Sequence, residues 1–217
     1  MKTERLRHAK VELALHTLRE GEGRPLLLLH GLGERTPAVL PPELATWPGP
    51  IHGLDFTGHG QSTIPRAGGY TAEVLMGDAD TALRHLKRAT LVGRGLGAYV
   101  ALLLAGARPC EVRGAILRDG LGLAGGGATP STPGIPFPNP SAGGTPDPFA
   151  LAELSRDVRP PDYATAFLRQ ANELSGLEWP VSVCCAERPD WLAAIAEEPG
   201  ARESRVEDAL RLYARVE

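Results

Sequence analysis

Three glycines in the middle of the chain carry the spacing of a chemical motif. Gly93, Gly95 and Gly97 match the Gly-x-Ser-x-Gly nucleophile elbow, in which the central serine attacks an acyl carbonyl carbon. The central position here is Gly95, which has no side chain and therefore no nucleophile. The surrounding residues 89–107 predict a buried strand, a tight turn and an apolar helix, which is the context that an elbow requires.

The rest of the chain alternates segments of strand and helix character, and these segments must position the motif. The segments that predict strands are Lys10–Leu18 at an edge, Leu26–His30, Ile51–Phe56, Ala89–Gly93, Val112–Leu117, Pro180–Ala186 and a polar edge at Ala201–Val206. The segments that predict helices are Thr71–Leu86 with Thr71 as N-cap, the residues after the elbow, Pro148–Leu174 with breaks at Pro160 and Pro161, Trp191–Ala196 and Glu207–Val216. This alternation indicates an α/β fold with a doubly wound, mostly parallel β-sheet flanked by helices. We expect one domain over residues 1–217.

One segment departs from this alternation. Residues 120–148 contain eight of the 26 glycines and seven of the 20 prolines, so they predict a long irregular loop in place of a full helical lid. The loop opens with a Gly-x-Gly-x-x-Gly pattern at 120–125. The residues after it cannot begin the helix that a dinucleotide site needs, so we reject that motif.

Composition excludes several kinds of partner and location. The net charge of −3 without a basic run argues against binding to nucleic acid or to an anionic membrane surface. No apolar run approaches the length of a membrane span, and the first residues lack the apolar core of a signal peptide. The three cysteines, Cys110, Cys184 and Cys185, are too few and too oddly placed for a disulfide framework, so we expect a cytoplasmic protein.

Four stretches together resemble the α/β-hydrolase family over most of the chain. They are LLLLHGLG at 26–33, LDFTGHGQS at 54–62, LVGRGLGAY at 91–99 and PVSVCCAERPD at 180–190. Each is weak alone, but all four stand in the family's order and spacing. The resemblance implies the α/β-hydrolase fold, with a site at the carboxyl ends of the strands.

The resemblance also implies a catalytic apparatus that this chain carries only in part. The backbone N–H groups of Leu32 and Leu96 match the oxyanion hole of the family, and backbone donors do not depend on side-chain type. The family's order is nucleophile, acid and then histidine, but all six histidines precede Gly95, the last of them being His85. An acid remains at Asp119, Glu187 or Asp190. We therefore predict no catalytic residues of the Ser-His-Asp type.

A set of residues near these motifs forms a candidate pocket. The set is His30, Gly31, Glu34, Arg94 and Asp119. Arg94 precedes a helix N-terminus, where an anion is favoured, but we expect it to form an ion pair with Asp119 or Glu187. The sequence predicts no cofactor and no metal site, because His52 and Asp55 point to opposite faces of a strand.

Two classes of function stay open. The first is a non-catalytic member of the fold that binds a small molecule or another protein, with no protein partner indicated by the sequence. The second is an active hydrolase or esterase that uses other residues, with Asp119, Glu34 or Arg94 as its polar groups. For the first class we expect Gly95→Ser to lower the melting temperature without restoring esterase activity, because glycine relieves the backbone strain of an elbow.

Overall fold

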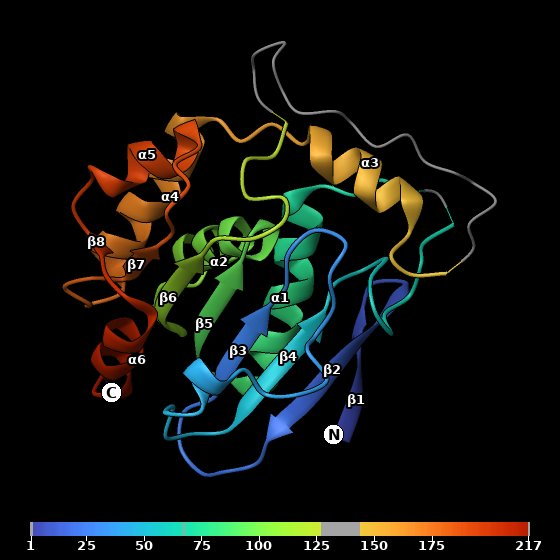
Figure 1. Cartoon of the computed structure of the whole chain (residues 1–217), viewed down its shortest axis with the longest axis horizontal. Coiled ribbons are helices and arrows are strands. Elements are labelled where there is room, and N and C mark those ends of the chain that lie inside the picture. The colour runs from blue at the N-terminus through green and yellow to red at the C-terminus, as the bar shows by residue number, and fades with distance from the viewer. Residues whose placement is uncertain (1, 67, 127–143, 217) are drawn as a thin grey trace.

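The computed structural model describes residues 2–66, 68–126 and 144–216 and contains one eight-stranded sheet (Figure 1). The strand order is β1-β2-β4-β3-β5-β6-β7-β8. The strands are β1 (Lys2–His8), β2 (Val11–Arg19), β3 (Leu26–Leu29), β4 (Ile51–Asp55), β5 (Ala89–Arg94), β6 (Val112–Arg118), β7 (Val181–Cys184) and β8 (Ala201–Glu203). All strands from β4 to β8 in this order run parallel, whereas β2 pairs antiparallel with both β4 and β1. The predicted fold class is confirmed.

The edge of the sheet differs from the sequence prediction. The segment predicted as an edge strand forms β2, which lies inside the sheet because β1 pairs along it from Lys2↔Thr17 to His8↔Val11. The charges of β1 alternate with partly buried residues, as in a strand with one face in water. Because of those charges, Lys2–His8 lacks the apolar pattern by which strands are identified in the sequence.

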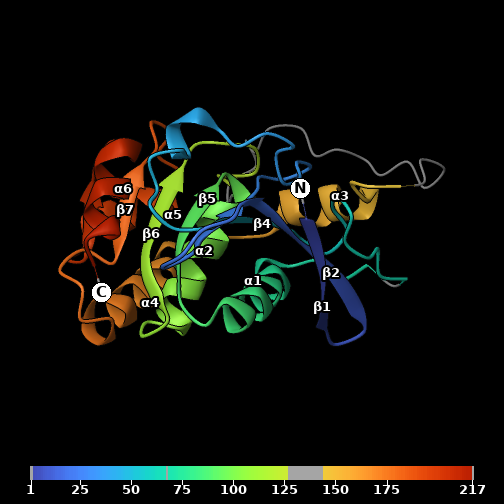
Figure 2. The ribbon, with the colours of Figure 1, turned by 90° about the horizontal axis from the view of Figure 1, so that it is seen from below.

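Most helices cover a single face of the sheet (Figures 1 and 2). The helices are α1 (Ala72–Leu86), α2 (Leu96–Ala107), α3 (Pro148–Arg156), α4 (Pro161–Leu174), α5 (Asp190–Ala196) and α6 (Val206–Ala214), with a 3₁₀ turn η1 (Pro42–Leu44). The apolar residues of α1, α2, α4 and α5 share one core with Leu27 and Leu91. Those of α6 and η1 pack with Leu28 and Val92, whose side chains point to the opposite face. None of the described helices is long and apolar enough to cross a membrane.

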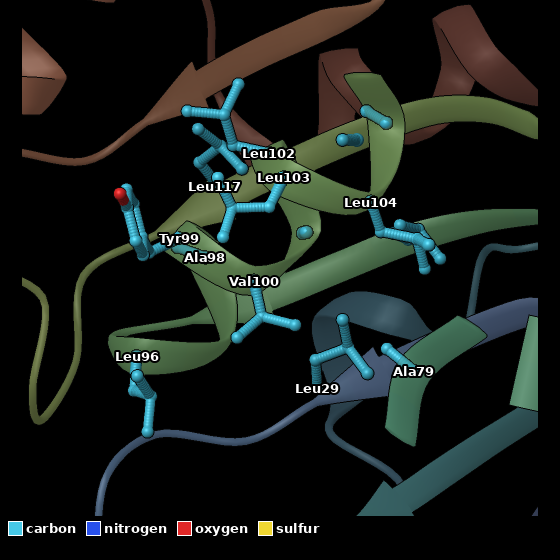
Figure 3. Close-up of a cluster of buried hydrophobic side chains, with 14 of the residues drawn as sticks. Leu29, Ala79, Leu96, Ala98, Tyr99, Val100, Leu102, Leu103, Leu104 and Leu117 are labelled. Carbon is cyan, nitrogen blue, oxygen red and sulfur yellow. The ribbon is translucent and has the colours of Figure 1, made fainter. Parts of the chain in front are cut away.

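Helix α2 forms the centre of the larger core. All its residues from Leu96 to Gly106 are buried, which suits a helix that is apolar on every side. Figure 3 shows Leu103 and Leu104 of this helix in the cluster that also holds Leu29 of β3 and Leu117 of β6. This packing holds the first turn of α2, and with it the elbow, against the carboxyl end of β5.

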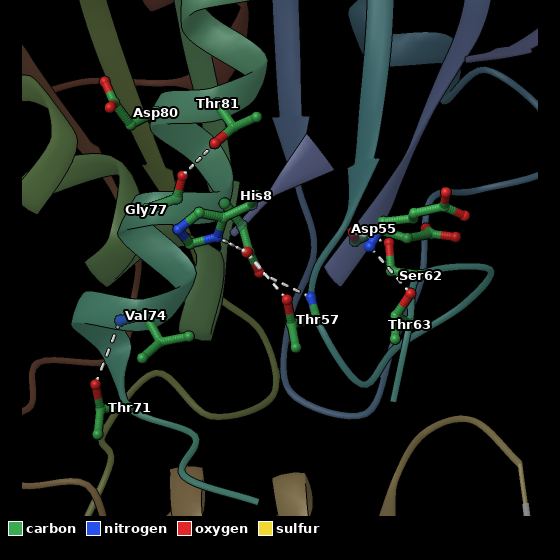
Figure 4. Close-up of polar contacts among 12 residues, drawn as sticks. His8, Asp55, Thr57, Ser62, Thr63, Thr71, Val74, Gly77, Asp80 and Thr81 are labelled. Atoms are coloured by element: carbon green, nitrogen blue, oxygen red, sulfur yellow. Dashed lines mark hydrogen bonds and ion pairs between the residues drawn. The ribbon is translucent and has the colours of Figure 1, made fainter. Parts of the chain in front are cut away.

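Local hydrogen bonds fix the elements next to the elbow (Figure 4). The Thr71 hydroxyl accepts from the Val74 N–H and caps α1, as the sequence predicted. The buried Asp78 carboxylate accepts from the Thr57 N–H and hydroxyl and contacts the His8 ring at 2.7 Å. These contacts tie α1 to the loop after β4 and to the edge strand.

The connection between β3 and β4 is unusual for neighbouring parallel strands. Such a connection normally contains an α-helix. Residues 30–50, all of which are described, contain only η1. Beside α6, the face of the sheet next to Leu28 and Val92 is therefore covered by irregular chain, which leaves room for a cavity.

The glycine- and proline-rich segment is only partly within the described residues. Residues 121–124 form a turn and a bend, and Gly126 makes an isolated bridge with Val158. Residues 127–143 lie outside the described part of the chain. Helix α3 then begins at Pro148 with Asp147 as its N-cap, where the sequence predicted the return to helical structure.

Candidate functional site

Gly95 occupies the turn between β5 and α2 and has the backbone conformation of an elbow. Its φ is +58° and its ψ is −119°, a combination that side chains disfavour. Its N–H donates to the Arg118 carbonyl oxygen at 3.0 Å, which fixes the turn against the neighbouring strand. The elbow geometry is therefore present without the side chain that it serves to expose.

The two N–H groups that the resemblance assigns to an oxyanion hole converge on one atom. Leu32, after β3, and Leu96, at the start of α2, each donate to the carbonyl oxygen of Leu121 at 2.9 Å. An oxyanion hole places its donors 2.7–3.1 Å from the developing negative oxygen. The Leu121 carbonyl oxygen thus occupies the position that the resemblance assigns to a substrate oxygen.

Bulky side chains brace the segment that carries this carbonyl. The buried Arg159 donates through Nη1 to the carbonyl oxygens of Gly122 and Leu123. Its guanidinium carbon lies 4.8 Å from the centre of the Tyr99 ring. Burial lowers the pKa of Arg159 to about 10, so it stays charged at neutral pH. The Trp191 indole N–H donates to the Leu123 oxygen at 2.8 Å.

The same segment fills the space beside the elbow. A Cβ atom added to Gly95 would lie 2.6 Å from the Gly120 carbonyl carbon and closer still to the Leu121 oxygen. Real Cβ atoms essentially never approach another heavy atom below 3.0 Å. A serine at this position therefore requires residues 120 and 121 to move.

The acid that the resemblance offers has another role. The Asp119 carboxylate, at the end of β6, accepts hydrogen bonds from the N–H groups of Ala186 at 2.7 Å and Glu187 at 3.1 Å. It joins the carboxyl ends of β6 and β7. No described histidine follows residue 85 in the chain, so no such ring is present for it to orient.

Two histidines near the site have both ring nitrogens engaged with backbone. His30 Nε2 accepts from the Phe56 N–H at 3.1 Å, so its Nδ1 donates to the Gly31 oxygen at 2.8 Å. His59 Nε2 accepts from the Gly33 N–H at 3.2 Å, and its Nδ1 contacts the Thr57 oxygen at 3.1 Å. Burial lowers the pKa of His30 to about 3 and also lowers that of His59. Both rings are therefore neutral near pH 7.

The predicted partner of Arg94 is wrong. Its Nε lies 3.0 Å from both carboxylate oxygens of Glu34, whereas Nη1 donates to the backbone oxygen of Asp119 at 2.9 Å. The side chain projects on the same face as Val92, where the Glu34 segment lies. The Asp119 carboxylate instead faces the two amides at the end of β7. Neither Asp119 nor Glu187 provides the paired carboxylate.

A cavity of about 430 Å³ opens beside Arg94, between the ends of β3, β5 and β6 and the segment 34–44. Its wall includes three residues of the predicted pocket, namely His30, Glu34 and Arg94. Gly31 and Asp119 do not line it. It is distinct from the position of the Leu121 carbonyl, because its floor includes Leu28 and Val92 on the face of the sheet away from α2.

Asp55 and His52, the metal ligands considered from the sequence, are bound to other groups of the protein. The Asp55 carboxylate accepts from the N–H groups of Thr36 at 2.7 Å and Gln61 at 2.8 Å and contacts His16 Nε2 at 3.0 Å. His52 contacts Thr17. Within residues 2–66, 68–126 and 144–216, no group of three or more His, Cys, Asp or Glu side chains is arranged to hold a metal ion.

The residues that close the elbow are absent from the sequence prediction. Leu121, Arg159 and Trp191 act through a backbone carbonyl and through contacts between segments far apart in the chain. No local pattern marks such contacts. The one available signal was the glycine on each side of Leu121, which allows a close approach to neighbouring backbone.

Comparisons with known proteins agree on family and fold. The model of the alpha/beta hydrolase family matches residues 26–216. The thioesterase domain from the curacin biosynthetic pathway has 18% identity and a TM-score of 0.64, with 99% of this chain and 97% of that chain covered. A hypothetical protein from Pseudomonas aeruginosa has 21% identity and a TM-score of 0.64, with 100% and 98% covered.

A third similar structure is a deformylase rather than a thioesterase. The N-formylmaleamic acid deformylase from Pseudomonas putida has 15% identity and a TM-score of 0.59, with 97% of this chain and 94% of that chain covered. A comparison with curated proteins gives no match. At these identities the structural likeness extends to the fold alone.

Proposed function

Because the chain belongs to the alpha/beta hydrolase family, we propose that it is a member that has lost Ser-His-Asp hydrolysis and binds a small molecule instead. We treat residues 1–217 as a single domain of this fold, as the one continuous sheet supports. The proposal has a chemical part, which concerns the elbow, and a binding part, which concerns the cavity.

The observation that carries the chemical part is the Leu121 carbonyl between Leu32 and Leu96. Stabilisation of the oxyanion is often the largest contribution to acyl-transfer catalysis. A hole already occupied by a backbone oxygen has no donors left for a substrate. Loss of the hole removes the residual catalysis that a member without its triad would otherwise keep.

The missing triad supports the same conclusion. Gly95 supplies no nucleophile, and no described histidine follows it to act as base. The alternative of an active enzyme would rely on Asp119, Glu34 or Arg94. Asp119 accepts from two backbone N–H groups, and Glu34 and Arg94 bind each other, so these contacts favour structural roles.

The cavity beside Arg94 supports the binding part. Its volume of about 430 Å³ falls within the range of about 300–1,000 Å³ that is typical of small-molecule sites. The net charge of −3 disfavours nucleic acid as a partner. All three cysteines are free thiols, which fits our assignment of the protein to the reducing cytoplasm. The proposal requires no cofactor or metal.

A fluorophosphonate probe tests the chemical part, because it labels activated serine nucleophiles covalently. The wild-type protein and the Gly95→Ser variant are treated in parallel with an active serine hydrolase as positive control. We expect no labelling of either protein. Labelling of the wild type would identify an active nucleophile, and labelling of the variant alone would show that the elbow and its hole remain accessible.

A further inference from the structure

Two arginines stand side by side at the carboxyl edge of the sheet. Arg94 of β5 and Arg118 of β6 are direct partners in the strand register, two residues beyond the partners Val92 and Ile116. All four side chains therefore project to the face away from α2. Like charges placed directly opposite each other on neighbouring strands are destabilising. Negative charge beside Arg94 and Arg118 therefore stabilises this arrangement.

Each arginine has one glutamate partner from the connection between β3 and β4. Glu34 contacts Arg94 Nε at 3.0 Å and also accepts from the Gly31 N–H at 3.0 Å, so two contacts hold it. Glu43 contacts Arg118 through one hydrogen bond of 2.8 Å. The Nε and Nη1 of Arg118 have no partner among the described residues. The pair with Glu43 is therefore the more easily replaced.

The cavity begins at these guanidinium groups and is apolar behind them. Leu28 and Val92 from the sheet and Leu44 from η1 line its interior. A third cation, Arg35, lies exposed on the rim and has no ion pair within the described chain. Three arginines against two glutamates leave one net positive charge around an apolar interior.

We propose that this cavity binds an organic monoanion with an apolar tail, its carboxylate on Arg94 and Arg118 and its tail against Leu28, Val92 and Leu44. This assignment rests on the proposed binding function and names its ligand class. Planar guanidinium groups match a carboxylate in a two-point fashion. Because the ligand carboxylate takes the place of Glu43, Glu34 and the ligand together still balance two of the three arginines.

The exchange of Glu43 for the ligand costs little. The Arg118–Glu43 pair is partly exposed, with 23% and 34% of the two side chains accessible to solvent. Pairs of this kind contribute little to stability because water solvates the separated charges well. Glu43 can turn into solvent while the ligand carboxylate takes its place, and burial of the tail provides the driving force.

Calorimetric titration with three probes tests the proposal. Octanoate carries both the charge and the tail, octan-1-ol carries the tail without the charge, and acetate carries the charge without a long tail. We expect octanoate to bind at one site and to bind at least about tenfold more tightly than either of the other probes. Equal binding of octan-1-ol would overturn the monoanion assignment while leaving a small-molecule site in place. Absence of octanoate binding would overturn it as well.

Three variants separate recognition from general packing. Arg118→Gln is expected to weaken octanoate binding about tenfold and to leave octan-1-ol binding unchanged. Glu43→Gln removes the competing carboxylate, so it is expected to tighten octanoate binding by about threefold or more. Arg169→Gln, which breaks the exposed ion pair with Glu198, is the matched control and is expected to change neither octanoate binding nor octan-1-ol binding. Weaker binding by Glu43→Gln would contradict the exchange.

The failure of this inference is distinguishable from failure of the proposed loss of hydrolysis. Binding of octanoate is measured without any reactive group, whereas hydrolysis is read from labelling and turnover at the elbow. Octanoate binding at one site together with fluorophosphonate labelling would uphold the site and overturn the loss of activity. Absence of octanoate binding together with absence of fluorophosphonate labelling would overturn the proposed carboxylate site and leave the proposed loss of hydrolysis intact.

Discussion

Gly95→Ala is the substitution that most directly probes the closed elbow. The added Cβ would lie 2.6 Å from the Gly120 carbonyl carbon and closer to the Leu121 oxygen. The atoms in its way are backbone, so no side-chain rotation can relieve the contact. The variant must either displace residues 120 and 121 or move the start of α2, which is buried on all sides.

The expected cost follows from two contributions. A side chain at φ +58° and ψ −119° costs about 1–3 kcal/mol. Displacement of the Leu121 carbonyl breaks its hydrogen bonds to Leu32 and Leu96, each worth about 0.5–1.5 kcal/mol. The free energy of unfolding should therefore fall by about 2–6 kcal/mol, a large share of the stability of a typical domain.

Denaturant unfolding of Gly95→Ala and of a matched control measures this cost. Gly176 has a φ of +68°, and a Cβ added there meets no heavy atom within 4 Å. Gly176→Ala thus carries only the conformational penalty, about 1–2 kcal/mol. We expect Gly95→Ala to lose clearly more stability than the control. Equal losses in the two variants would refute the steric argument and the occupied hole with it.

The remaining predictions concern the groups around the elbow. The pKa of about 3 for His30 lies below its ordinary value of 6.5, so the unfolded chain takes up this proton first as the pH falls. Stability should be full above pH 6.5, and His30 alone should remove about 2 kcal/mol by pH 5. A His30 ring that NMR shows to be protonated at pH 5 would contradict this. Trp191→Phe keeps an aromatic ring, but phenyl is smaller than the buried indole and lacks its hydrogen bond to the Leu123 oxygen, so the free energy of unfolding should fall by at least about 1 kcal/mol. Unchanged stability in denaturant would show that this bond does not brace the segment. Asp119→Asn weakens the two hydrogen bonds from the backbone N–H groups of Ala186 and Glu187, so the free energy of unfolding should fall by about 1–3 kcal/mol and the melting temperature with it. A loss of ester turnover in this variant would instead identify Asp119 as a catalytic acid.

Periodicity and turn chemistry predicted most of the fold. The apolar run at Leu26–His30, the Thr71 cap and the strand after Pro180 all have local causes, namely burial on both faces, side-chain capping and proline boundaries. The strand β1 was missed because its pairing with β2, rather than its own apolar content, makes it a strand.

The site was predicted less completely, for a physical reason. The positions of Gly95, Leu32 and Leu96 could be inferred because a motif fixes their spacing. The Leu121 carbonyl could not, because every residue carries a carbonyl and only the folded chain decides which one reaches the elbow. The choice of Glu34 rather than Asp119 as the partner of Arg94 likewise depends on which face of β5 each carboxylate reaches.

Turnover of short- and medium-chain activated aryl esters by the purified wild-type protein shows whether Leu32 and Leu96 can still stabilise a substrate oxyanion. An open oxyanion hole without a triad can retain about 10³–10⁴-fold catalysis over water. In the proposed loss of hydrolysis, the Leu121 carbonyl oxygen already accepts from both N–H groups that would form this hole, so we expect a rate within about tenfold of the buffer reaction. An acceleration of about 10³-fold or more would show that the hole is available to substrate and would contradict the proposed loss of hydrolysis.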